Sequence, residues 1–122
     1  MVRRSKVIFT KAALTATSLF LIFIATVARA NERVEICAEY TDTGRRYHVT
    51  AIATSGIELD LATQSHDYNV RARYIVIFWA QDQASVIEMG TGFIAPSHFA
   101  HSGTDQEGRS WEISWYSPAK CR

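Results

Sequence analysis

A short apolar run at residues 74–80 (YIVIFWA) constrains the fold of this chain more than any other feature. It contains no charge and no amide, and its β-branched and aromatic side chains suit a pleated surface better than a helix, which is the alternative. Alternation along a strand places Ile75 and Ile77 on one side, and Val76 and Phe78 on the other. The run therefore predicts a strand that is apolar on both faces and lies in mid-sheet or in a closed barrel.

Residues 1–30 have the plan of a secretory signal peptide. A basic start at residues 3–11 precedes an apolar stretch, and Ala28-Arg29-Ala30 supplies small residues at the two positions that a signal peptidase inspects. We expect cleavage after Ala30 and export to the periplasm or the medium. The alternative is an uncleaved membrane anchor, since the apolar run Ala12–Ala28 is only slightly shorter than the ~20 residues that span a bilayer.

Removal of this leader changes the charge of the protein. Residues 1–30 hold five of the 13 basic residues and none of the 12 acidic ones, so residues 31–122 carry a formal charge of −4. Nucleic acid and anionic membrane surfaces need a basic partner, and we exclude both as ligands of the exported chain. The 92 residues that remain are enough for one domain with a thin core.

Two cysteines frame the exported domain. Cys37 lies near its start and Cys121 is the penultimate residue of the chain. In an exported protein such a pair predicts one disulfide that closes most of the domain into a loop. The alternative is a pair of free thiols that bind a metal, although no Cys-x-x-Cys spacing is present.

Alternating apolar and polar residues predict short strands along the rest of the domain. The predicted strands cover residues 34–40, 45–54, 57–61, 71–80, 84–89 and 110–116. Ser55-Gly56 predicts a two-residue hairpin connection, and residues 62–70 predict a loop with room for one helical turn. Residues 93–105 stay ambiguous, because Pro96 permits a short helix over residues 96–99. Six or seven short strands without a long helix predict an all-β fold, either a small antiparallel barrel or a sandwich.

One cluster of polar residues has a spacing suited to metal binding. His98 and His101 form a His-x-x-His pair, with Asp105 four residues further on, and two imidazoles plus a carboxylate could bind zinc. The alternative is a polar loop with two solvated histidines. A hydrolase triad of Ser97, His98 and Asp105 is not favoured, because triad members come from separated segments and no Gly-x-Ser-x-Gly pattern occurs.

Tryptophans and charged residues of the strands allow two interpretations. Trp79, Trp111 and Trp115 fall on the apolar phase of strands, which predicts core positions, but they could also form a platform for stacking sugars. Carboxylates on the outward phase are interpreted as solvated, not as a glycosidase pair; these are Glu35, Glu39, Glu58, Asp60, Glu88 and Glu112. Arg71 and Arg73 lie either at the exposed start of the central strand or in an ion pair with a carboxylate such as Glu88.

The central hairpin resembles the periplasmic and membrane-bound inhibitors of C-type lysozyme, which are small exported β-barrels. That family has a Ser-Gly-x-x-Tyr motif, then a hairpin and a Tyr/Phe-Trp-x-Lys-Gly motif, with cysteines near both ends of the domain. Here Ala72-Arg73-Tyr74 and Phe78-Trp79 resemble the ends of the two motifs, and Cys37 and Cys121 resemble the cysteine pair. The resemblance covers about twenty residues and implies a barrel fold and, more weakly, an inhibitor-like role.

This chain departs from the family at the residues that inhibit. In the family, the Ser and the Lys of the two motifs enter the lysozyme cleft. Val70-Arg71 stands here in place of Ser-Gly, Gln81-Asp82 stands in place of Lys-Gly, and the gap between the motifs is shorter. We therefore take Arg71, Arg73, Gln81 and Asp82 as the candidate interaction surface.

These observations favour binding over catalysis. We expect a small exported envelope protein that contacts another protein or a cell-wall component and needs no cofactor. The alternative is a metal-assisted hydrolase that uses His98, His101 and Asp105, with zinc as its cofactor.

Overall fold

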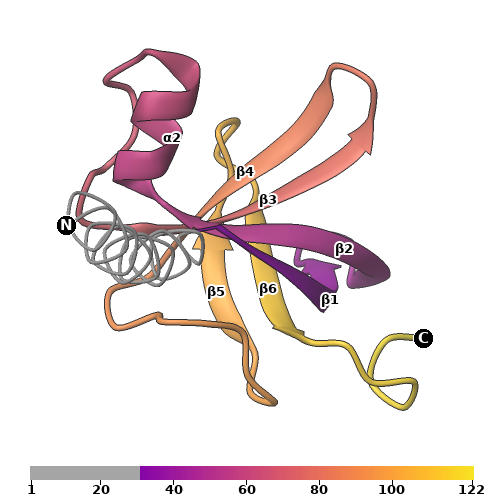
Figure 1. The fold of residues 1–122 in the computed structure, drawn as a ribbon. Coiled ribbons are helices and arrows are strands. Elements are labelled where there is room, and N and C mark those ends of the chain that lie inside the picture. Colours follow the sequence, from indigo (N-terminus) through magenta and orange to yellow (C-terminus); the bar gives the residue numbers. More distant parts are fainter. Residues whose placement is uncertain (1–30) are drawn as a thin grey trace, which may run out of the picture. The chain divides into compact units, whose positions relative to one another are not determined.

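Six antiparallel strands close into a barrel in the computed structural model, which describes residues 31–122 (Figure 1). The strands are β1 (Glu32–Tyr40), β2 (Arg45–Ser55), β3 (Arg73–Ala80), β4 (Gln83–Met89), β5 (His101–Thr104) and β6 (Ser110–Trp115). Each strand pairs with the next along the chain, and β6 returns to pair with β1. The prediction of a small antiparallel all-β fold is confirmed, and it is a barrel with six strands. The predicted signal peptide lies outside the described residues.

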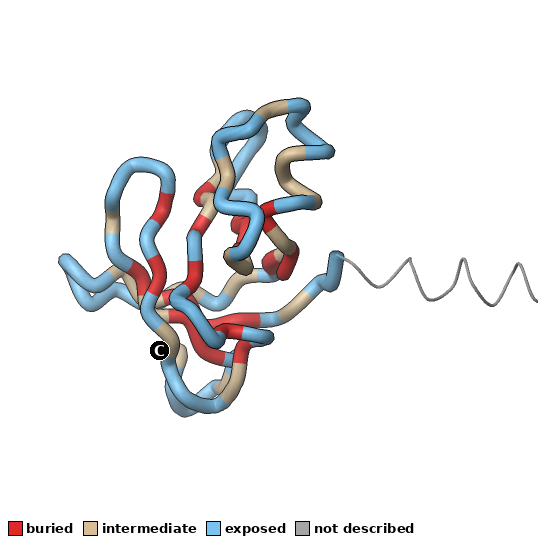
Figure 2. The backbone as a smooth tube through the Cα atoms, turned by 90° about the vertical axis from the view of Figure 1, so that its left-hand side faces the viewer, coloured by how far each residue is buried: buried red, intermediate tan, exposed pale blue. Residues whose placement is uncertain are grey.

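The barrel interior is filled by the inward phase of the strands, and Figure 2 shows the buried positions gathered in them. The predicted alternation of β1 and β2 is confirmed: Ile36 and Ala38 of β1 and Ala51 and Ala53 of β2 are all buried. Other strands complete the core with Ile75, Ile77, Ile87, Met89, Trp111 and Ile113. Isoleucine dominates because a branched side chain fills a narrow barrel with little loss of rotamer freedom.

The two-faced burial predicted for residues 74–80 holds only for the first half of β3. Residues 74–77 are buried on both faces, whereas Phe78 is 67% exposed and Trp79 is 38% exposed. The pairing with β2 ends at Ile77, and beyond this point β3 pairs with β4 alone. The end of the hairpin therefore extends beyond its neighbours (Figure 1), which leaves Phe78 largely exposed.

A helix, α2 (Gly56–Thr63), replaces the hairpin and strand predicted at Ser55-Gly56 and residues 57–61. Ser55 is the N-cap residue, and its hydroxyl accepts a hydrogen bond from the Glu58 backbone N–H at 3.3 Å. The Ser-x-x-Glu spacing of a capping box was thus present in the sequence. Gly56 is needed at the first turn, because a Cβ there would lie 1.9 Å from the Asn69 carbonyl oxygen.

The segment between β4 and β5 contains no helix, so the short helix considered at residues 96–99 is wrong. The chain crosses residues 90–100 as loop and bends, and the Ser97 carbonyl accepts a hydrogen bond from the Trp115 N–H at 2.8 Å. Pro96 and the small residues around it favour this irregular path over a helix.

The predicted disulfide is confirmed. Cys37 in β1 bonds to Cys121, with Cα atoms 5.5 Å apart and a sequence separation of 84. The bond fastens the segment that follows β6 onto the outside of the barrel. The Arg46 guanidinium adds a hydrogen bond from β2 to the Lys120 carbonyl at 2.7 Å.

Candidate functional site

A pocket with a volume of about 590 Å³ lies at one end of the barrel. We call it the barrel mouth. Four aromatic residues from four strands form its floor: Tyr40 (β1), Tyr47 (β2), Trp79 (β3) and Trp111 (β6). Its polar rim comes from the β3–β4 turn, the start of β4 and the β5–β6 turn, and consists of Asp82, Gln83, Ser85, Gln106, Glu107 and Arg109.

The aromatic floor continues the inward phase of the core strands. Tyr40 comes two residues after buried Ala38, and Trp79 two residues after buried Ile77. The rings of Trp79 and Trp111 stack with centroids 5.8 Å apart and planes 27° from parallel, and Tyr47 meets Trp79 edge-on at 5.2 Å. Tyr40 packs on Trp111 at 5.3 Å. Such offset and edge-on contacts are the favourable arrangements of aromatic pairs, so the floor is a packed cluster.

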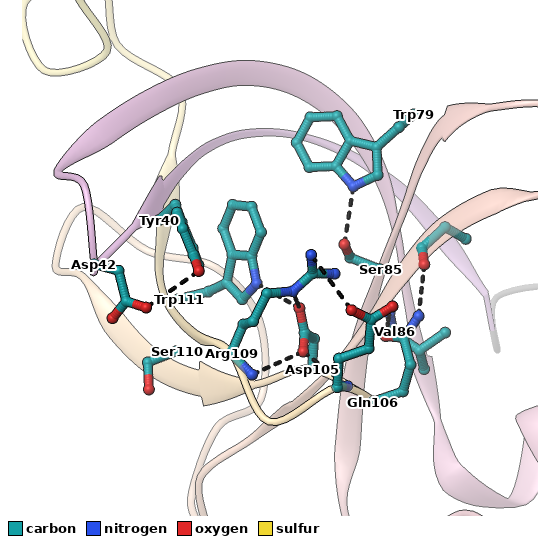
Figure 3. Close-up of polar contacts among 12 residues, drawn as sticks. Tyr40, Asp42, Trp79, Ser85, Val86, Asp105, Gln106, Arg109, Ser110 and Trp111 are labelled. Atoms are coloured by element: carbon teal, nitrogen blue, oxygen red, sulfur yellow. Dashed lines mark hydrogen bonds and ion pairs between the residues drawn. The ribbon is translucent and has the colours of Figure 1, made fainter.

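Trp79 occupies an irregularity of the β3–β4 pairing. The register runs through Phe78↔Ala84 and then jumps to Ala80↔Gln83, which leaves Trp79 without a partner residue in β4. Its indole N–H donates to the Ser85 hydroxyl at 2.9 Å, as Figure 3 shows. A bulge of this kind bends a strand and re-aims a side chain, and here the side chain reaches the barrel mouth.

Asp105 is the polar anchor of the barrel mouth (Figure 3). Its side chain has no exposed surface. One oxygen accepts hydrogen bonds from the backbone N–H groups of Glu107 and Arg109, both at 2.9 Å. The other oxygen accepts from Arg109 Nε at 2.8 Å and Trp111 Nε1 at 3.0 Å. This carboxylate thus fixes the β5–β6 turn, the guanidinium and the buried indole together.

The electrostatics of Asp105 follow from these contacts. Burial alone would raise its pKa, but the hydrogen bonds from Trp111 and from the Arg109 backbone and side chain outweigh burial and lower the pKa below its ordinary value. The same contact raises the pKa of Arg109, because a guanidinium hydrogen-bonded to a carboxylate is stabilised in its charged form. Arg109 also lies beside the exposed carboxylate of Glu107, with Nη1 and Oε2 3.6 Å apart.

Gln106 joins the rim to β4. β4 pairs with β5 through two residue pairs only, which leaves the backbone of Ala84 and Val86 without a partner strand on that side. The Gln106 side-chain amide replaces one: its oxygen accepts from the Val86 N–H at 2.8 Å, and its nitrogen donates to the Ala84 carbonyl at 2.7 Å. The β5–β6 turn is therefore tied to β4 in the barrel wall.

The residues of the metal hypothesis do not come together. His101 lies beside Ser97, with Nε2 and Oγ 3.0 Å apart, and packs against Phe93. His98 lies next to Trp115, with ring centroids 5.9 Å apart, while Asp105 is enclosed at the barrel mouth. Within residues 31–122, no group of three or more His, Cys, Asp or Glu residues could hold a metal ion.

The four residues of the candidate interaction surface lie at opposite ends of β3. Asp82 lines the barrel mouth and Gln81 precedes it in the β3–β4 turn. Arg71 and Arg73 lie at the start of the strand, about 25 Å from that turn at the usual rise per residue. Glu88 accepts a hydrogen bond from the Tyr74 hydroxyl at 3.0 Å, and within residues 31–122 neither Arg71 nor Arg73 forms an ion pair with it.

Some of the tryptophans and carboxylates considered in the sequence lie outside the barrel mouth. Trp79 and Trp111 share the barrel mouth, whereas Trp115 is 49% exposed and lies beside His98. Glu35 accepts a hydrogen bond from Thr50, and Glu39 pairs with Arg46 at 3.0 Å. Neither glutamate lines the barrel mouth.

Several residues of the site were missed from the sequence: Tyr40, Tyr47, Gln106, Glu107 and Arg109. An aromatic residue at the end of each of several predicted strands was the available signal. It becomes a signal only when a closed barrel brings those strand ends together.

The fold and the pocket define a closed antiparallel barrel with an aromatic, charge-rimmed mouth. No family model, no curated protein and no solved structure matches the chain. Among residues 31–122, no helix has the length and apolar character needed to cross a membrane.

Proposed function

We propose that this protein is an exported binding module and that its ligand, a protein or a cell-wall component, occupies the barrel mouth. The observation that carries the proposal is the aromatic floor beneath a rim of charged and amide side chains. Its volume of about 590 Å³ lies in the range of ligand pockets, which combine apolar walls with a few placed polar groups.

The rigidity of the barrel mouth supports the same role. Asp105 and Gln106 fasten the β5–β6 turn through hydrogen bonds of 2.7–3.0 Å, so the rim is ordered before a ligand arrives. A site that is already ordered loses less entropy on binding. The resemblance to lysozyme inhibitors is in keeping with a binding role, although this chain lacks their inhibitory Ser and Lys.

Export rests on the leader and on the disulfide. A bond between Cys37 and Cys121 is in keeping with an oxidising compartment, because cytosolic proteins seldom keep structural disulfides. Metal-assisted hydrolysis by His98, His101 and Asp105 has no such support, since the Asp105 oxygens already accept four hydrogen bonds.

A retention experiment tests the proposal. The full chain is expressed and purified from the cell envelope, and its intact mass reports whether it begins at Asn31. It is then immobilised and exposed to envelope extract, beside the variants Trp79→Ala and Trp115→Ala. We expect a retained component that is lost with Trp79→Ala and kept with Trp115→Ala, an exposed tryptophan outside the barrel mouth. A component retained equally by both variants, or none at all, contradicts the proposal.

A further inference from the structure

The structure points to a saccharide as the ligand class of the barrel mouth, and we propose that this site binds a glycan with one pyranose ring stacked on Trp79. The inference rests on the proposed function, because it names the ligand of the same site. It is carried by the exposure of Trp79, by two carboxylates on the rim and by the network beneath them.

Trp79 presents carbon surface to the solvent. The residue remains 38% exposed, yet the only polar atom of its indole is engaged, because the N–H donates to Ser85 at 2.9 Å. Trp111 stacks against it within the floor, and Tyr47 supports its edge. An exposed, immobilised ring of this kind suits a flat ligand with C–H groups on its face, as a pyranose ring has. Stacking also costs little entropy here, because the ring is already fixed.

The rim supplies hydrogen-bond acceptors that line the same pocket as Trp79. Asp82 and Glu107 lie in the two turns that border the pocket, and both residues are exposed. Carboxylates accept hydrogen bonds through two oxygens each, which matches the adjacent hydroxyl donors of a sugar. Asp82 adopts a left-handed backbone conformation with φ 62°, an arrangement that Asp tolerates better than most residues.

Arg109 complements these acceptors. Asp105 holds its Nε, so the guanidinium keeps a fixed orientation, and its terminal nitrogens, with Nη1 3.6 Å from Glu107 Oε2, can donate to hydroxyl, ring or amide oxygens. The Arg109 side chain is 40% exposed, so its guanidinium is accessible to a ligand. The rim thus offers acceptors and donors close together, as a ring of hydroxyl groups requires.

Other ligand classes fit these charges less well. A lipid would strip water from Asp82 and Glu107 without replacing their hydrogen bonds. A nucleotide could stack on Trp79, but its phosphates would face the two carboxylates in a domain of formal charge −4. A basic side chain of a protein partner is the remaining competitor, since a cation is attracted by both an indole face and carboxylates.

Titration with defined oligosaccharides tests the inference. Chitotriose and cellotriose are added to the purified protein while tryptophan fluorescence and binding heat are recorded. We expect saturable binding of at least one of them, with Kd raised at least tenfold by Trp79→Ala and severalfold by Asp82→Asn. Asn keeps the tolerance for a left-handed backbone, so this second variant remains informative if Trp79→Ala folds poorly. Trp115→Ala is the matched control and should leave Kd unchanged.

The outcomes separate this inference from the proposed function. No binding of either trisaccharide, or binding that Trp79→Ala leaves unchanged, overturns the saccharide ligand. If the envelope retention experiment then yields a protein that depends on Trp79, the barrel mouth is a protein-binding site and the proposed function stands. If nothing in the envelope depends on Trp79, both are wrong.

Discussion

A single buried carboxylate organises the barrel mouth at the scale of residues. Asp105 satisfies two backbone N–H groups of its own turn and two side chains that line the pocket, Arg109 and Trp111. Each donor would be left without a partner if the carboxylate were removed, and an unsatisfied buried donor costs more than a hydrogen bond contributes. The pairing between Asp105 and Arg109 also gives the rim its one oriented cation.

We predict that Asp105→Asn lowers the free energy of unfolding by about 2–4 kcal/mol, because a buried carboxylate that accepts four hydrogen bonds is replaced by an amide whose N–H faces other donors. Glu107→Gln is the control; its exposed carboxylate makes only a 3.6 Å contact, and its loss should not be measurable. Urea denaturation of the three proteins at neutral pH checks this. Equal stability of Asp105→Asn and the unsubstituted chain would mean that the turn is held by other contacts.

Acid pH provides a second measurement of the same residue. The folded-state pKa of Asp105 is lowered, so its contribution is present above the unfolded-state pKa of about 4 and is lost as the pH falls through the folded value. The unsubstituted chain should therefore lose more stability between about pH 5 and pH 2 than Asp105→Asn does. Parallel acid profiles would contradict this role of the carboxylate.

At the scale of elements, the sequence predicts a strand well where one face is buried and the other is wet. The alternation Val34, Ile36, Ala38, Tyr40 places β1 correctly, since the period of two is itself the physical cause of burial. The same two-residue alternation wrongly predicts a strand at residues 57–61, which belong to α2 and where Ile57 and Leu61 are exposed. The local cap at Ser55 and the close approach of Asn69 to Gly56 determine that helix.

The candidate site was predicted less well than the fold. The sequence indicates Asp82 as a candidate, and it allows a second interpretation of the tryptophans as a sugar platform. Trp115 lies outside the barrel mouth, and Asp105, a metal ligand only in the alternative hypothesis, holds the β5–β6 turn instead. Strand pairing decides which side chains meet, and a single sequence contains no direct record of that pairing.

We predict that the two halves of β3 respond differently to truncation. Ile77 is fully buried in the barrel, so Ile77→Ala should cost about 2–5 kcal/mol through the cavity that it leaves. Phe78 is its neighbour in sequence, but it is 67% exposed where β2 no longer pairs with β3, so Phe78→Ala should cost under about 1 kcal/mol. Chemical denaturation of both variants measures the difference. A large loss for Phe78→Ala would mean that another element covers the hairpin end in solution.

At the scale of the whole molecule, a small hydrophobic core is combined with one disulfide between residues far apart in the sequence. The 92 described residues form a barrel whose seam between β4 and β5 has only two residue pairs. The Cys37–Cys121 bond lies on the other side of the barrel, at β1, where it joins the first strand to the segment after the last. A small barrel gains from such a bond, because its hydrophobic core alone supplies limited stability.

We predict that reduction of this disulfide lowers the free energy of unfolding by about 2–4 kcal/mol, somewhat less than the ~4–5 kcal/mol that loop closure alone suggests for an 84-residue separation. The loss is smaller because the last residues keep contacts of their own, including the bond from Arg46 to the Lys120 carbonyl. Urea denaturation with and without reductant measures the difference, and mass analysis should show the oxidised chain two protons lighter. The variant Cys121→Ser in oxidising buffer should match the reduced protein, which separates loss of the bond from other effects of reductant. Unchanged stability in both would mean that packing, and not the covalent bond, holds the two ends of the barrel together.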